Sequence, residues 1–160
     1  MSPELAPMKS ETSRSPDKSD AIEILLVEDD AGDAERTMAA LREGKIRNRV
    51  VWVQDGEQAL QYLFRTGTFA RACRPDLVLL DWWLPKINGS EVLDRIKNHP
   101  EMKRIPVVIL TASTQDEDVL RAYNSHANCF ITKPVGVDAF IRVVRSIEDF
   151  WMTIVKLPAA

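Results

Sequence analysis

Five short apolar runs alternate with five helical patterns along most of the chain, and this alternation limits the folds that the sequence can adopt. The runs are AIEILLV, RVVWV, DLVLL, IPVVIL and NCFI. The helical patterns that follow them begin near Ala31, Asp55, Gly89, Thr114 and Val137. Strands that alternate with helices form a parallel sheet with helices on both faces. The sequence therefore predicts an α/β fold, a doubly wound (βα)5 arrangement around a five-stranded parallel sheet.

The first 20 residues differ in composition from the rest of the chain. The segment MSPELAPMKSETSRSPDKSD is rich in Ser, Pro and charged residues and has few apolar side chains. Such a segment cannot bury enough apolar surface to offset the entropy cost of ordering it. We therefore expect residues 1–20 to form a disordered tail and residues 21–160 to form one domain that ends in an extended helix. A chain of 160 residues is large enough for one hydrophobic core and too short for two.

Charge and cysteine content argue against several classes of protein. The net charge is -3 at pH 7, whereas a nucleic-acid-binding protein needs a concentrated basic surface. Cys73 and Cys129 lack the spacing of a zinc site and are too few for a disulfide framework. No apolar run reaches the roughly 18 to 20 residues needed to cross a bilayer, and the N-terminus lacks the apolar segment of a signal peptide. The sequence thus predicts a cytoplasmic protein that binds neither nucleic acid nor membrane.

Charged and hydroxyl side chains stand at the ends of four predicted strands. The first strand ends in Glu28, Asp29 and Asp30, the third in Asp81 and the fourth in Thr111, and Lys133 follows the fifth. In a doubly wound sheet these strand ends share one edge, and the ligand site lies there, where the strand order reverses. Asp30 has a second explanation, because an acidic residue at this point also caps the next helix.

The carboxylates at this edge would repel one another unless a cation lay among them. A hard divalent cation with oxygen ligands resolves this conflict, and Mg2+ that keeps several waters is the simplest candidate. The ammonium of Lys133 supplies a point charge for a phosphate group, and the hydroxyl of Thr111 supplies a hydrogen-bond donor. The strand ends therefore predict a site for Mg2+ and a phosphoryl group.

Four motifs, in this order and spacing, carry a resemblance to a known family. ILLVEDD, LVLLDWWLPKINGSEVL, IPVVILTAS and ITKP resemble the receiver domain of two-component response regulators over residues 21–150. The resemblance implies a flavodoxin-like receiver fold with Asp81 as the phosphoacceptor. It also implies that Glu28, Asp29, Asp81 and the backbone carbonyl of Trp83 hold Mg2+, that Thr111, Lys133 and Phe130 form the phosphoryl-binding and switch set, and that a cis peptide bond precedes Pro134.

The same resemblance implies a signalling protein rather than an enzyme with a separate substrate. Asp81 would take a phosphoryl group from a sensor histidine kinase, and the protein would take part in its own phosphorylation and dephosphorylation. Thr111 and Phe130 would then move and change the surface that meets the next partner. No output domain follows in the sequence, so the output is expected to be protein contact, dimerisation or phosphotransfer. The stretches HANCFITKPVGVDAF and IEDFWMTIVKLP look like stand-alone regulators that partner bacterial phytochrome kinases.

Three other classes of protein share part of this pattern. A haloacid-dehalogenase-like phosphatase also uses a strand-end Asp with Mg2+ and Lys, but its second acid falls where Trp83 stands. A nucleotide-binding Rossmann domain needs a glycine-rich turn after the first strand, where this chain has three acidic residues. A pseudo-receiver that acts only as an interaction module stays an alternative, although such proteins usually lack part of the residue set.

The two tryptophans that follow Asp81 are predicted to have different roles. Strand alternation turns Trp82 away from the face that Asp81 uses, so we expect it in the core beneath a helix. Trp83 points with Asp81 toward the edge of the sheet, where its indole is expected to cover the site and exclude water.

The last helical pattern is longer than a five-stranded sheet needs. It runs from Val137 to about Val155, roughly 28 Å at 1.5 Å per residue. One apolar stripe contains Phe140, Val144, Ile147 and Trp151, and a second contains Val143, Phe150, Ile154 and Leu157. A helix that is apolar on so much of its surface needs a further partner.

This surplus apolar surface predicts a homodimer. Its interface would use the helix that begins near Thr114, the last strand and the C-terminal helix, with the side chains of Val143, Phe150, Trp151 and Ile154. The alternative is that Trp151 and Ile154 fold back over the edge of their own sheet.

Overall fold

The computed structural model describes residues 21–44, 46–123 and 129–146, which form one sheet and its covering helices. The strands are β1 Ile22–Val27, β2 Asn48–Val53, β3 Leu77–Asp81, β4 Val107–Thr111 and β5 Cys129–Thr132. The helices are α2 Ala31–Glu43, α3 Gly56–Phe64, α4 Gly89–Lys97, α5 Thr114–Tyr123 and α6 Val137–Ser146, with a short 3-10 turn η2 at Gly67–Phe69. The predicted order of alternating strands and helices is confirmed, and only η2 was not expected.

All five strands are parallel and lie in the order β2-β1-β3-β4-β5. The chain moves from β1 outward to β2 and then crosses back to β3, so the direction of winding reverses between β1 and β3. A crevice opens at the carboxyl ends of the strands at such a reversal, and ligands bind there in this class of fold. The doubly wound sheet is therefore as predicted, and Glu28 and Asp81 stand on either side of the reversal.

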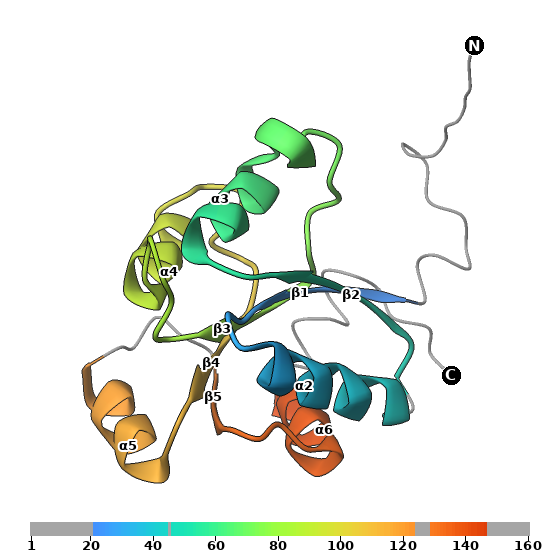
Figure 1. Cartoon of the computed structure of the whole chain (residues 1–160), viewed down its shortest axis with the longest axis vertical. Coiled ribbons are helices and arrows are strands. Elements are labelled where there is room, and N and C mark those ends of the chain that lie inside the picture. Colours follow the sequence, from blue (N-terminus) through green and yellow to red (C-terminus); the bar gives the residue numbers. More distant parts are fainter. Residues whose placement is uncertain (1–20, 45, 124–128, 147–160) are drawn as a thin grey trace.

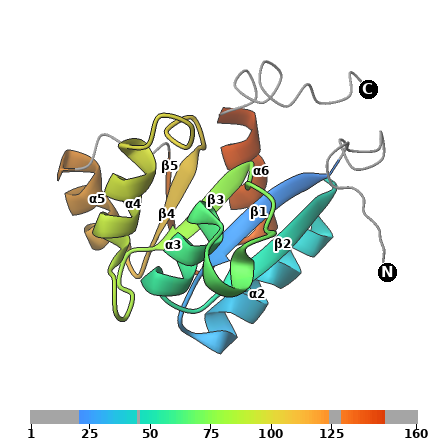
Figure 2. The ribbon, with the colours of Figure 1, turned by 90° about the horizontal axis from the view of Figure 1, so that it is seen from above.

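Helices cover both faces of the sheet, with α2 and α6 on one face and α3 and α4 on the other (Figure 1). The view from above shows the sheet between these two layers (Figure 2). Each face has its own core because strand side chains alternate between the faces. Leu25, Val27, Val78 and Leu80 point to the α3/α4 side, whereas Ile24, Leu26, Leu77 and Leu79 point to the α2/α6 side.

Polar caps fix the points at which three helices begin. The side chain of Asp30 accepts a hydrogen bond from the backbone N–H of Asp33 at the start of α2. Asp55 and Asn88 cap α3 and α4 in the same manner. A cap of this kind satisfies one of the backbone donors that the first helical turn leaves unpaired. The capping role that the sequence offered for Asp30 is therefore confirmed.

Close packing around two glycines fixes the loop between β3 and α4. A side-chain carbon at Gly56 would lie 1.7 Å from the backbone oxygen of Ile87. A side-chain carbon at Gly89 would lie 2.7 Å from the backbone oxygen of Asp81. Real side chains do not reach such short distances, so both positions need glycine for the loop to pack here. The loop after Asp81 is thereby held between the first turns of α3 and α4.

The last described helix, α6, is buried along one side. Phe140 and Val144 pack against the sheet, as predicted for the first apolar stripe. Val143, which was expected at a dimer interface, is only 5% exposed and belongs to the same core, so packing within the protomer already explains its burial. Phe150, Trp151 and Ile154, the predicted continuation of the helix, and the predicted tail lie outside the described residues. Among the described helices, none is long and apolar enough to cross a membrane.

Candidate functional site

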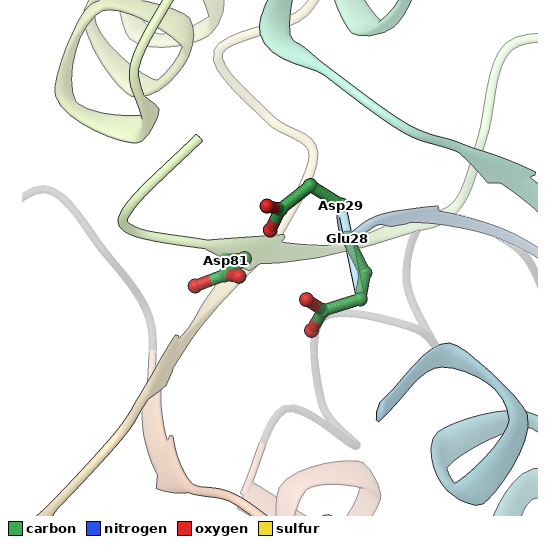
Figure 3. A group of neighbouring side chains, drawn as sticks. All are labelled: Glu28, Asp29 and Asp81. Carbon is green, nitrogen blue, oxygen red and sulfur yellow. The ribbon is translucent and has the colours of Figure 1, made fainter. Parts of the chain in front are cut away.

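Three carboxylates lie close together at the edge of the sheet where the strands end. Glu28 and Asp29 follow β1, and Asp81 is the last residue of β3. Ligand oxygens of Glu28, Asp29 and Asp81 all lie within 4.8 Å of one another (Figure 3). We call these three residues the acidic cluster. Glu28 and Asp81 are buried, and Asp29 is exposed. The structure thus brings together the three side chains that the sequence predicted as metal ligands.

The donors of the acidic cluster suit a hard divalent cation. All three are carboxylates, and the group includes neither Cys nor His, which softer metals such as zinc prefer. The exposed position of Asp29 leaves one side of the site open to solvent, as a cation that keeps part of its water shell requires. The cluster could therefore hold a hydrated divalent ion between Glu28, Asp29 and Asp81.

Lys133 is the cation that faces the acidic cluster in the structure. Its ammonium lies 3.1 Å from a Glu28 oxygen and 3.3 Å from an Asp81 oxygen. Burial by itself would lower the pKa of Lys133, but the hydrogen bond to Asp33 and the charges of Asp81 and Glu28 raise this pKa above its ordinary value. Lys133 is therefore held in its charged form. The peptide bond between Lys133 and Pro134 is cis, as predicted.

Glu28 has an environment that favours its protonated form when no metal is bound. Burial raises the pKa of Glu28 to about 7, and the hydrogen bond and charge of Asp81 act in the same direction. The backbone N–H of Asp30, at 3.2 Å, and the ammonium of Lys133 oppose this rise. Binding of a divalent cation would have to displace this proton, so cation and proton compete at Glu28.

The hydroxyl of Thr111 lies at the end of β4, buried and next to β5. Its nearest acceptors are the backbone oxygens of Ser113, at 3.2 Å, and Ile131, at 3.4 Å, and the hydroxyl of Thr132, also at 3.4 Å. The Thr132 hydroxyl donates in turn to Glu117 on α5. These acceptors are long or shared, so the Thr111 hydroxyl has no single strong partner among them.

Two residues that the sequence analysis missed contact this site directly. Asp33, in the first turn of α2, lies 2.9 Å from the ammonium of Lys133, closer than either Glu28 or Asp81. The indole N–H of Trp52 donates a 2.7 Å hydrogen bond to the backbone oxygen of Glu28. Both contacts join segments far apart in the sequence. The one sequence signal for Asp33 was its place in the first turn of the helix after the acidic strand end.

The aromatic residues near the site differ strongly in exposure. Trp82 is 9% exposed and Phe130 is also 9% exposed, and both belong to the core beneath α3 and α4. Trp83 is 67% exposed, and its backbone N–H lies 3.4 Å from an Asp81 oxygen. The predicted core position of Trp82 is confirmed. The Trp83 side chain is mostly exposed to solvent rather than buried, and its effect on the access of water to the site stays a prediction.

Comparison with known proteins agrees with this arrangement. Residues 24–145 match the family model of the response regulator receiver domain. Response regulator Rcp1 of Synechocystis sp. is 42% identical over 137 residues, which are 86% of this chain and 93% of that protein. The family match includes most of β1, all of the other strands and every residue of the acidic cluster, so the resemblance drawn from the four motifs is confirmed.

Solved structures give the same result. The bacteriophytochrome response regulator AtBRR has 41% sequence identity and a TM-score of 0.76, over 82% of this chain and 95% of that one. The Mn(2+)-bound form of Rcp1 has 42% identity and a TM-score of 0.66, over 86% of this chain and 99% of that one. Close relatives therefore share the flavodoxin-like fold, and one of them, Rcp1, has a Mn(2+)-bound form.

Proposed function

Because the chain belongs to the response regulator receiver domain family, we propose that it accepts a phosphoryl group on Asp81 from a sensor histidine kinase. Receiver domains are phosphoacceptors that bind a divalent metal, and phosphorylation by a histidine kinase is typical of the family. In the transfer, the bond between phosphorus and the histidine nitrogen breaks, and a bond between phosphorus and a carboxylate oxygen forms. Asp81 is the nucleophile in this proposal.

One observation carries the proposal: Asp81 belongs to the acidic cluster and also contacts the ammonium of Lys133. The distance from an Asp81 oxygen to the Lys133 ammonium is 3.3 Å, and a ligand oxygen of Asp81 lies within 4.8 Å of ligand oxygens of Glu28 and Asp29. A phosphoryl group carries negative charge, so its transfer to a carboxylate needs nearby positive charges. A divalent cation supplies one of these charges, and Lys133 supplies the other.

We propose Mg2+ as the physiological ion, held by Glu28, Asp29, Asp81 and the backbone carbonyl of Trp83. Oxygen ligands and an open, solvated side suit its preference for retaining water. The Mn(2+)-bound form of Rcp1 supports a divalent ion in a relative of the same fold.

Thr111 and Phe130 form the proposed switch. The Thr111 hydroxyl has only long or shared acceptors within the protein, so little is lost when it turns toward a phosphoryl group on Asp81. Movement of Thr111 away from β5 leaves space that the ring of Phe130, two residues before Thr132 on β5, can fill. The surface formed by α5, β5 and α6 would change as a result.

The direct test is incubation of the protein with acetyl phosphate and Mg2+, followed by intact mass measurement. The wild-type protein is expected to gain one phosphoryl group that is stable in acid and labile in base. Asp81→Asn removes the nucleophile but keeps the shape, so it should fold and fail to label. Labelling of Asp81→Asn at the wild-type rate, or an unlabelled wild-type protein, would contradict the proposal.

The proposed kinase is a bacteriophytochrome. The support is the 41% identity to AtBRR, which is a bacteriophytochrome response regulator. The test compares phosphotransfer to this protein from a purified bacteriophytochrome histidine kinase and from a histidine kinase with an unrelated sensor. A clear preference for the phytochrome kinase is expected, and equal rates would argue against this partner.

A homodimer through α5, β5 and α6 remains a proposal. A hollow of about 640 Å³ lies on this face between the three elements. Val119 on α5 is one of only two large apolar side chains that are exposed among the described residues. Light scattering should find a dimer that Val119→Glu weakens, whereas Asp118→Asn, its exposed neighbour on α5, should have no effect. A monomeric wild-type protein would contradict the proposal.

A further inference from the structure

Asp33 contributes a fourth carboxylate next to the site, and it differs from the acidic cluster in what it contacts. Its Oδ2 lies 2.9 Å from the ammonium of Lys133. Its Oδ1 accepts a hydrogen bond from Arg36, one turn along α2. Asp33 is not among the carboxylates whose oxygens gather within reach of a single ion. It therefore binds the lysine without belonging to the predicted set of metal ligands.

The position of Asp33 is fixed by the helix that carries it. Its backbone N–H donates to the Asp30 side chain, the N-terminal cap of α2. Its side chain is held from one side by Arg36 and from the other by Lys133. A carboxylate with both oxygens paired on a capped helix is a rigid anchor for a flexible lysine side chain.

The Lys133 ammonium has three acidic contacts in the structure, and two of them belong to the acidic cluster. A divalent cation in that cluster attracts the same carboxylates and repels the ammonium. The attraction of Glu28 and Asp81 for the lysine ammonium is then weaker, whereas the negative charge of Asp33 still attracts it. A lysine with no remaining partner would turn toward solvent, because its long side chain gains rotamer freedom there.

We propose that Asp33 is a positioning residue for phosphoryl transfer, which keeps the Lys133 ammonium at the edge of the site once a divalent cation has engaged the acidic cluster. This inference rests on the proposed function, because it concerns how Lys133 is made ready for a phosphoryl group on Asp81. Asp33 acts only through Lys133 and does not touch the transferred group.

A competing explanation is that Asp33 only stabilises α2, since an acidic residue in the first turn interacts favourably with the helix dipole. Glu35 provides a matched control for this explanation. It lies two residues further along the same helix and is exposed, and the structure shows it in no contact with Lys133. Glu35→Gln removes the same charge from the same helix and leaves the lysine contact intact.

The test measures the rate of labelling by acetyl phosphate and Mg2+ in four variants. Asp33→Asn should label roughly tenfold more slowly than wild type, the size expected for loss of one charge-assisted hydrogen bond in the transfer step. Glu35→Gln should label at the wild-type rate. Lys133→Met should be slow, and adding Asp33→Asn to it should cause no further loss, because the two residues act as one unit.

A second measurement does not depend on phosphorylation. Lysine-selective NMR of the Mg2+-saturated protein should show an ordered Lys133 ammonium in the wild type and in Glu35→Gln, and a mobile one in Asp33→Asn. An ordered Lys133 in Asp33→Asn, or a wild-type labelling rate in that variant, would overturn the role of Asp33. An unlabelled wild-type protein would instead overturn the proposed function, so the two failures can be told apart.

Discussion

The hydroxyl of Thr132 donates a 2.8 Å hydrogen bond to the carboxylate of Glu117, which joins the end of β5 to the first turns of α5. The same hydroxyl lies 3.4 Å from the hydroxyl of Thr111. Hydrogen bonds therefore connect Thr111 at the edge of the site, through Thr132 on β5, to Glu117 on α5. Any movement of Thr111 toward Asp81 breaks its contact with the Thr132 hydroxyl.

Replacement of Thr132 tests these hydrogen bonds. Thr132→Val keeps the shape of the side chain but leaves the Glu117 carboxylate without this donor, so the free energy of unfolding should fall by about 0.5–1.5 kcal/mol. Thr132→Ser keeps the hydroxyl and is the matched control. Urea unfolding measures both, and equal losses in the two variants would show that the hydroxyl itself contributes nothing.

Removal of Asp29 should weaken binding of Mg2+. Asp29→Ala deletes one oxygen ligand of the acidic cluster, so the affinity should fall by at least about tenfold. Asp30→Asn removes a neighbouring charge and keeps a side chain able to cap α2, so it controls for the general loss of charge. Quenching of tryptophan fluorescence by Mg2+ measures the affinity. Similar affinities in Asp29→Ala and wild type would place the metal elsewhere.

The stability of the metal-free protein should depend on the protonation of Glu28. Burial raises the pKa of Glu28 from 4.5 to about 7 in the folded state, so between these values the folded protein binds more protons than the unfolded one. The free energy of unfolding should therefore fall as pH rises through this window, by up to about 3 kcal/mol from this group.

Glu28→Gln supplies the comparison for this pH dependence. The variant lacks the titrating group. The difference between the free energies of unfolding of wild type and variant should therefore change between about pH 4.5 and 7. Asp33 titrates outside this window, because its hydrogen bond with Lys133 lowers its pKa below 3.8. Parallel pH profiles of the two proteins would contradict a raised pKa of Glu28.

The two neighbouring tryptophans should respond very differently to truncation. Trp82→Ala leaves a cavity in the core and should cost about 3–5 kcal/mol of stability. Trp83→Ala removes an exposed side chain and should change stability by less than about 0.5 kcal/mol. Since the Trp83 indole is mostly exposed to solvent, Trp83→Ala should also leave the lifetime of the phosphorylated protein unchanged. A markedly shorter lifetime would instead support the idea that Trp83 excludes water.

The sequence predicted the parts of the site that strand ends determine. Glu28 and Asp81 each follow an apolar run, and parallel strands bring such positions to one edge of the sheet. Trp52 and Asp33 were missed for a different reason. Their contacts depend on how β2 and the first turn of α2 lie against the edge of the sheet, and neither residue falls in a strand-end pattern. The high exposure of Trp83 could not be predicted either, because Trp83 lies in the loop after β3, where strand alternation no longer applies.

The contact between Gly56 and the backbone of Ile87 also limits how this protein can be engineered. The loop from 83 to 88 borders Asp81, the proposed phosphoacceptor, so it is an obvious segment to exchange when one regulator is to be given the surface of another. A transplanted loop with a different path at residue 87 would collide with the first turn of α3, because the gap at Gly56 has no spare room. A working chimera must therefore carry the donor's α3 together with its loop.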